Sequence, residues 1–121
     1  MPRTAQADNH SVMQLSVLTP DVPHAPEHLV WTGLGGDSLP LAIANAARQH
    51  EGLVVVITPD MQSAELLQDQ VTFFSARQAL PVTTFPDWET LPYDSFSPHP
   101  DIVSERLATL YALPEQHRGL L

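Results

Sequence analysis

A glycine-rich turn carries the residues whose types and spacing come nearest to a nucleotide site. A working phosphate loop has the pattern G-x-x-x-x-G-K-[ST], in which backbone amides cradle phosphate, the lysine neutralises the terminal phosphates and the hydroxyl holds Mg²⁺. The chain places Gly-Asp-Ser on the Gly-Lys-Ser positions of this pattern. We call this segment the glycine turn, and it consists of Gly33, Leu34, Gly35, Gly36, Asp37 and Ser38.

Two departures from the phosphate-loop pattern bear directly on nucleotide chemistry. Trp31 stands where the first glycine belongs, and Asp37 stands where the lysine belongs. Like charges about 4 Å apart, in an effective dielectric near 20, repel by about 4 kcal/mol, so Asp37 would oppose each charge of a phosphate. The chain contains no lysine that could take over this role. We expect either a decayed nucleotide loop with no functional cofactor-binding residue or a turn that only caps a helix.

The same turn also supports an enzyme hypothesis. Residues 36–39 read Gly-Asp-Ser-Leu, the signature around the nucleophile of the GDSL-type esterases, which makes Ser38 a candidate nucleophile. A serine nucleophile needs a histidine base and an aspartate that orients it. The Asp-x-x-His spacing that those esterases use occurs here only at Asp21 and His24, ahead of the expected fold. A GDSL-type esterase is therefore one alternative function, and an unrelated acidic partner-binding module is a second.

The composition excludes several classes of site. The chain has 121 residues, 14 of them acidic against five arginines, and a net charge of −9, which argues against direct DNA binding and favours a basic protein partner. It contains no cysteine, so disulfides and thiolate metal sites are excluded. Its six histidines are scattered, and we expect no metal site. We also expect no membrane contact and a cytoplasmic location, because neither a long apolar run nor a signal pattern is present.

Alternating apolar runs and helical patterns predict an α/β domain with a parallel sheet. Strands are expected at 28–32, 53–58, 82–85 and from 119 onward, the second of them buried on both faces because its β-branched run does not alternate. Helices are expected to begin at Asp37 or Ser38, at Asp60 and at Asp101, the last two ending near Ala76 and before Pro114. Residues 1–27 are expected to form a disordered or weakly ordered arm, and residues 28–121 a domain whose sheet is incomplete at the C-terminus.

The loop at residues 86–100, called here the proline loop, fits neither the helical nor the strand period. It holds four prolines and three large aromatic residues, Trp88, Tyr93 and Phe96, within fifteen positions. Prolines prevent this run from continuing a helix or a central strand. The rings either anchor the loop to its own domain or face a neighbouring domain, and both interpretations stay open. Because the loop also carries acidic residues, we expect no direct DNA contact from it.

Residues 82–113 resemble the N-terminal, UvrB-like module of the bacterial transcription-repair coupling factors (Mfd). The most specific match is the run Asp-Trp-Glu-Thr-Leu-Pro-Tyr-Asp-Ser-Phe-Ser-Pro-His in the proline loop. The resemblance covers roughly residues 28–121, and it is carried by 87–99, 101–110, 53–60, 66–74 and 118–119.

This resemblance implies a phosphate-loop (RecA/helicase-like) sheet topology and a nucleotide loop that has decayed. It implies a parent protein that uses ATP and Mg²⁺ to move on DNA, displaces stalled RNA polymerase and recruits UvrA in nucleotide excision repair. The UvrA-contacting part of that family lies beyond residue 121, so these residues would be a non-catalytic scaffold for downstream domains of the same protein. The candidate interdomain or anchoring residues are Trp88, Tyr93, Phe96 and His99.

Overall fold

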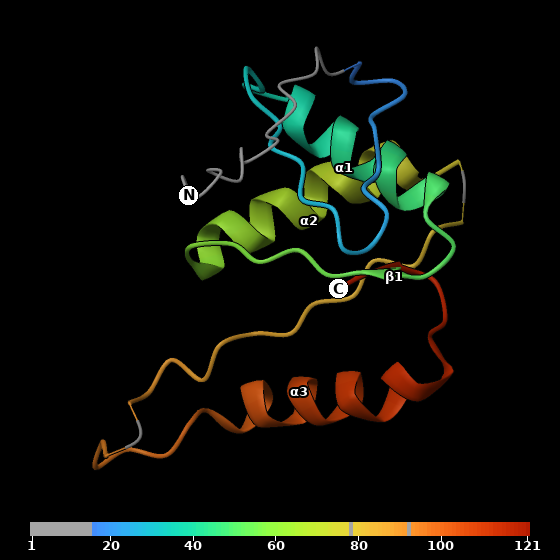
Figure 1. Cartoon of the computed structure of the whole chain (residues 1–121). Helices are drawn as coiled ribbons and strands as arrows, with labels where there is room; N and C mark the ends of the chain where they lie inside the picture. Colours follow the sequence, from blue (N-terminus) through green and yellow to red (C-terminus); the bar gives the residue numbers. More distant parts are fainter. Residues whose placement is uncertain (1–15, 78, 92) are drawn as a thin grey trace, which may run out of the picture.

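The computed structural model describes residues 16–121 except residues 78 and 92, so most of the expected N-terminal arm lies outside the described residues. The described chain contains both helices and short parallel strands (Figure 1). This confirms the predicted α/β class, whereas the phosphate-loop topology stays a prediction. The elements are α1 (Ser38–Gln49), β1 (Leu53–Val54), α2 (Met61–Ser75), α3 (Pro100–Ala112), the 3₁₀ turn η1 (Leu113–Glu115) and β2 (Gly119–Leu120).

The sheet is small and parallel, as the sequence predicts. β1 pairs with β2, with Leu53 opposite Gly119 and Val54 opposite Leu120. Val82 forms an isolated parallel bridge to Leu120 from the other side. The last strand in the sequence therefore lies between two segments that precede it.

The helices lie in layers on both sides of this sheet. α1 and α2 pack together on one side, and α3 runs along the other (Figure 1). The core lies between the α1–α2 layer and the sheet, where Ala44, Ala47, Val71 and Leu120 are buried against one another. The alanines of α1 let the two helices approach closely, which explains why a helix with few large side chains is largely buried.

The starts of α2 and α3 show how nearby residues determine where a helix begins. α2 begins after Asp60, as predicted, and the Asp60 carboxylate accepts a hydrogen bond of 2.7 Å from the Ser63 amide. The predicted cap of α3 at Asp101 is wrong by two residues. His99 is the N-cap, and its Nδ1 accepts from the Asp101 amide at 3.3 Å. The reason is Pro100, whose fixed φ and missing N–H suit the first position of a helix.

Three expected strands are shorter than predicted or absent. Residues 28–32 form no strand, the run at 53–58 is a strand only over Leu53–Val54, and the run at 82–85 is reduced to the bridge at Val82. A strand requires a hydrogen-bonded neighbour, and among the described residues the backbone bonds to the segment 119–121 reach only as far as Val56 in the first run and Thr83 in the second. Apolar composition predicted where strands could form but not which segments would meet.

The predicted burial of 53–58 on both faces is also wrong. Val55 is 59% exposed and Ile57 is 91% exposed. α3 lies against the neighbouring segment instead, because Thr109 Oγ1 donates to the Thr84 carbonyl oxygen at 2.9 Å. Within the described part of the chain, α3 therefore lies beside residues 84–85 and leaves Val55 and Ile57 uncovered.

The described part of the expected arm touches the domain. The Asn45 side-chain amide of α1 donates to the Val17 carbonyl oxygen at 3.0 Å, and Pro20 is fully buried. These contacts hold residues 16–20 against α1. The domain boundary at residue 28 stays a prediction.

Candidate functional site

The glycine turn is held together by its own hydrogen bonds. The Ser38 hydroxyl donates to the Gly35 carbonyl oxygen at 2.7 Å and accepts from the Gly35 amide at 2.9 Å. Gly33 and Gly36 have φ of +75° and +53°, a backbone conformation that favours glycine. The glycines and Ser38 therefore shape the entry into α1.

Asp37 is the N-cap residue of α1, but its side chain makes no capping hydrogen bond. Its Oδ1 instead accepts from Gln70 Nε2 of α2 at 3.0 Å. The carboxylate at the lysine position of the phosphate-loop pattern thus links α1 to α2. A phosphate loop joins a strand to a helix, whereas the residues that precede this turn form no strand.

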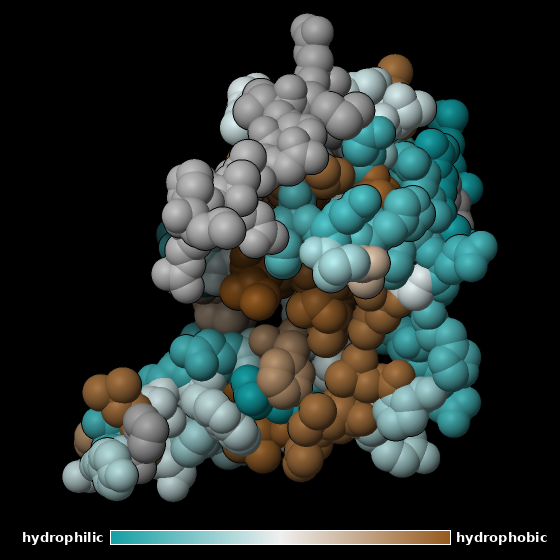
Figure 2. Space-filling view, in the orientation of Figure 1, coloured by the Kyte–Doolittle hydropathy of each residue, from teal (hydrophilic) through white to brown (hydrophobic). Residues whose placement is uncertain are grey.

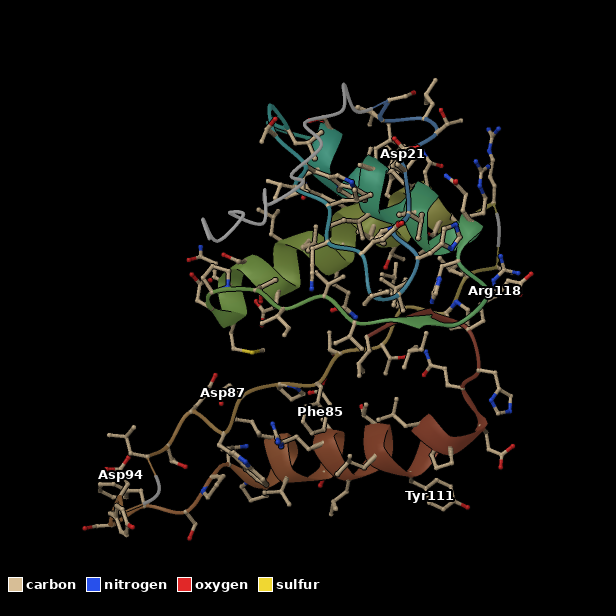
Figure 3. All side chains as sticks on the ribbon, viewed as in Figure 1. Asp21, Phe85, Asp87, Asp94, Tyr111 and Arg118 are labelled. Atoms are coloured by element: carbon tan, nitrogen blue, oxygen red, sulfur yellow. The ribbon has the colours of Figure 1, made fainter. Side chains whose placement is uncertain are left out.

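The residues of the esterase hypothesis are not brought together among the described positions. The Ser38 hydroxyl is bonded to Gly35, and no histidine is hydrogen-bonded to it. The backbone amide of His24 donates to the Glu27 carboxylate at 3.2 Å, a contact within the turn at residues 24–27 and not with Ser38. Asp21 lies beside α1 in Figure 3 and has no hydrogen bond to His24 in the described structure.

The start of the proline loop is fixed to α3 by an arginine. The guanidinium carbon of Arg106 lies 3.9 Å from the centroid of the Phe85 ring and 4.2 Å from that of the Trp88 ring. Arg106 also donates a hydrogen bond to the Pro86 carbonyl oxygen. Trp88 therefore contacts its own domain through Arg106, and its side chain is 41% exposed, so both interpretations given above stay predictions.

Tyr93 and Phe96 behave differently from Trp88. They are 100% and 82% exposed, and they flank Asp94 in the sequence, which lies far from α1 and α2 in Figure 3. Asp94 closes a turn there, because its Oδ2 accepts from the Leu91 amide at 2.8 Å. His99, the fourth candidate, has a local role as the N-cap of α3, and its Nδ1 lies 3.4 Å from the Asp101 carboxylate.

Sequence reasoning missed Arg106 and Phe85. A signal for Arg106 was present, because it shares a helical face with Ile102, Thr109 and Leu113, whose spacing of three or four residues points them the same way. An arginine on such a face needs a partner that covers its charge and its donors. The partner could not be read from the sequence, because it comes from a loop some twenty positions earlier.

A cleft of about 760 Å³ lies where the parallel segments end, between the start of α2 and the beginning of the proline loop. Parallel α/β sheets bind ligands at this edge. Figure 2 shows apolar surface between the two helical layers on this side of the molecule. Apolar side chains dominate the walls, and the charged residues of the lining are Asp60, Glu65, Asp87, Glu105 and Arg106. No residue of the glycine turn reaches this cleft.

Among residues 16–121 apart from 78 and 92, no group of three His, Asp or Glu side chains is placed to hold a metal ion. In the same described part of the chain, no helix is both long and apolar enough to cross a bilayer.

Comparison with known proteins decides the family. The chain is 50% identical over 88 residues to the transcription-repair-coupling factor of Escherichia coli (strain K12), an alignment that spans 73% of this chain and 7% of that protein. The chain belongs with the transcription-repair-coupling factors. It is also 38% identical over 109 residues to the factor of Haemophilus influenzae, spanning 89% of this chain and 9% of that protein. No protein-family model matches the chain.

These relatives confirm the family that the proline loop predicted. The chain spans less than a tenth of the length of either transcription-repair-coupling factor, since the shares are 7% and 9%. The two relatives are named for coupling transcription to repair.

Proposed function

We propose that this chain is a non-catalytic scaffold within a transcription-repair coupling factor. The observation that carries the proposal is the 50% identity over 88 residues to such a factor, of which the chain spans only 7%. The part would contribute to a UvrB-like module with phosphate-loop (RecA/helicase-like) topology and would contact downstream domains of the same protein.

The parent's activity is proposed from the family as a whole. The parent would be a cytoplasmic, ATP-dependent DNA translocase that displaces stalled RNA polymerase and recruits UvrA in nucleotide excision repair. ATP and Mg²⁺ would be bound outside these residues, because this chain has no lysine for the terminal phosphates.

The contacts of the glycine turn support a role without nucleotide chemistry. A phosphate loop uses its serine hydroxyl as a Mg²⁺ ligand, but Ser38 both donates to and accepts from Gly35. Asp37 adds a negative charge where phosphate charge would accumulate, and Gln70 holds that carboxylate in place. Binding Mg-ATP here would require breaking both arrangements.

Titration calorimetry with Mg-ATP tests the non-catalytic role. We expect no binding heat from this chain, and we expect Asp37→Lys alone to restore neither binding nor hydrolysis because Trp31 still replaces the first glycine. A full-length transcription-repair-coupling factor is the positive control. A micromolar dissociation constant for this chain would overturn the proposal.

The esterase alternative is tested separately. Hydrolysis of a chromogenic short-chain ester is compared between the chain and Ser38→Ala, with a known GDSL esterase as the positive control. We expect equal, background rates, since no histidine contacts Ser38 among the described residues. A serine-dependent rate above background would replace the scaffold proposal with an enzyme.

A further inference from the structure

His99 stands where the proline loop meets α3, and one of its ring nitrogens lies near two different partners. The distance from Nδ1 is 3.3 Å to the Asp101 amide nitrogen and 3.4 Å to the Asp101 carboxylate oxygen Oδ2. The amide can only donate a hydrogen bond, and an ionised carboxylate can only accept one. One nitrogen cannot serve both partners at once, because it accepts when it carries no proton and donates when it carries one.

The charge of the ring determines which partner Nδ1 can bind. A neutral imidazole with its proton on Nε2 leaves Nδ1 free to accept from the Asp101 amide, and this is the bond that caps α3. In the imidazolium ion both nitrogens carry protons, so the cap bond is lost and Nδ1 donates to the Asp101 carboxylate instead. Histidine side chains change charge between about pH 5 and about pH 8. The two arrangements are therefore exchanged by pH.

Two electrostatic effects on the protonated ring oppose each other. The N-terminus of a helix carries a partial positive charge, which disfavours an imidazolium ion at the N-cap. The Asp101 carboxylate favours this ion, although the attraction is small because the side chains of His99 and Asp101 are 66% and 92% exposed. Since neither effect dominates, a change of pH can decide between the two partners.

The other charged groups near the start of α3 leave this exchange to Asp101. Those of the proline loop, of α3 and of the adjoining η1 are Asp87, Glu89, Asp94, Glu105, Arg106 and Glu115. Within the described part of the chain, none of the acidic ones forms an ion pair with the His99 ring. Arg106 donates to the Pro86 carbonyl oxygen, and the carboxylates of Asp94 and Glu105 accept other hydrogen bonds.

The remaining bonds at the start of α3 do not depend on the ring. The Val103 amide donates to the His99 carbonyl oxygen at 3.2 Å, and the Ser104 hydroxyl donates to the Pro100 carbonyl oxygen at 2.9 Å. α3 therefore keeps its first backbone hydrogen bond in either state of the ring. The exchange of partners is confined to the point where the proline loop joins the helix.

We propose that His99 is a pH-sensitive cap that ties the end of the proline loop to α3 when its ring is neutral and releases the Asp101 amide when its ring is protonated. The start of the loop is held by Arg106, which stays charged over this whole pH range. The loop thus has one attachment that pH does not alter and one that it does. Both partners of the ring belong to a residue two positions away, so the device does not rest on the scaffold role.

NMR spectroscopy of this chain between about pH 8 and about pH 5 tests the exchange. The nitrogen shifts of the His99 ring report where its proton lies, and the amide proton shift of Asp101 reports the cap bond. We expect a neutral ring that is protonated on Nε2, and an upfield shift of the Asp101 amide proton with the same midpoint as protonation of the ring. A neutral ring protonated on Nδ1, or an Asp101 amide that does not follow the ring, overturns the proposal.

His99→Asn separates the cap from its charge. Asparagine also caps helices but does not titrate in this range, so the Asp101 amide shift should stay constant. His117→Asn is the matched control, because it removes a histidine that follows η1 and should leave the titration of Asp101 unchanged. An Asp101 amide that titrates alike in both variants contradicts the role of His99.

Backbone relaxation of the amides at Ser97, His99 and Asp101 tests the release of the loop end. In acid, these amides should become more mobile in the unaltered chain, whereas those of His99→Asn should keep the mobility that they have near neutral pH. Equal mobility in the two proteins at about pH 5 would show that the ring exchanges partners without freeing the loop, and the proposed cap would then be wrong.

Discussion

Arg106 of α3 lies against Trp88 of the proline loop, with 4.2 Å between the guanidinium carbon and the ring centroid. Phe85 covers the guanidinium on another side at 3.9 Å. One side chain thus connects the end of the sheet, the start of the loop and the helix that follows the loop. The rest of the loop extends from this fixed point toward Asp94, away from α1 and α2 (Figure 3).

We expect Arg106→Met to destabilise the domain by about 1–2 kcal/mol. A cation–π contact contributes about 0.5 kcal/mol when exposed and about 2 kcal/mol when desolvated, and the hydrogen bond to Pro86 is lost as well. Urea denaturation followed by tryptophan fluorescence measures the change. Arg77→Met is the control, because Arg77 is exposed. Equal midpoints for the two variants would show that the arginine does not hold the loop.

Replacing Tyr93 or Phe96 with alanine should leave the stability of the domain unchanged. Both rings are largely solvent-exposed, at 100% and 82%, so truncation removes few contacts. Trp88→Ala, by contrast, should lower the melting temperature. If the stable Tyr93→Ala variant alters UvrA binding or ATP hydrolysis in the full-length factor, the loop tip faces another domain. Damage-dependent crosslinking of Tyr93 to DNA would contradict the expected absence of DNA contact.

Gly119→Ala should be far more damaging than Gly35→Ala. Gly119 has φ of +127°, and an added Cβ would lie 2.5 Å from the Pro81 carbonyl oxygen. The backbone strain alone costs about 1–3 kcal/mol, and the clash displaces β2 from Val82. A Cβ at Gly35 meets no atom within 4 Å. Chemical denaturation compares the variants, and similar losses at both positions would contradict the close approach at Gly119.

Asp60 should make the stability of α2 depend on pH. The hydrogen bonds that its carboxylate accepts from Ser63 hold the pKa of Asp60 below its ordinary value of 3.8. A lowered folded-state pKa stabilises the fold above the ordinary value, and this contribution is lost as the pH falls through the folded pKa. The Tm gap between the chain and Asp60→Ala should therefore be largest near neutral pH and shrink below about pH 4.

Asp60→Asn provides the control for this pH effect. Asparagine also caps helices but carries no charge, so its Tm should follow a flatter pH course than that of the unaltered chain in the acid range. A gap between the chain and Asp60→Ala that stays constant down to pH 2 would show that the carboxylate is not the source.

Local signals predicted the helices better than the strands. Asp60 marks the start of α2 through a hydrogen bond from the Ser63 amide, and the prolines at 100 and 114 mark helix ends because they lack a backbone N–H. As a result, α2 and α3 lie within a residue or two of the predicted positions. The length of a strand depends on which distant segment pairs with it. The run at 53–58 therefore had the right composition, but its backbone is hydrogen-bonded only where residues 119–121 reach it.

The candidate site was predictable to a similar, limited extent. The absence of a lysine was plain from the sequence, and the residue run at 87–99 in the proline loop indicated the family. The sequence could not predict which aromatic ring contacts the domain and which rings stay exposed, because the contact of Trp88 depends on Arg106 from a separate helix. The cleft could not be predicted either, since its walls come from segments 43–87 and 105–121.

The position of β2 sets an order of events during synthesis. Among the described elements, Gly119–Leu120 is the last to leave the ribosome, yet both β1 and Val82 obtain their strand pairing from it. α1 and α2 can pack as soon as they emerge, but the sheet cannot close until those residues follow. A translational pause before residue 119 would thus leave two strand edges unpaired on the nascent chain, the state most exposed to misassembly and to chaperone capture.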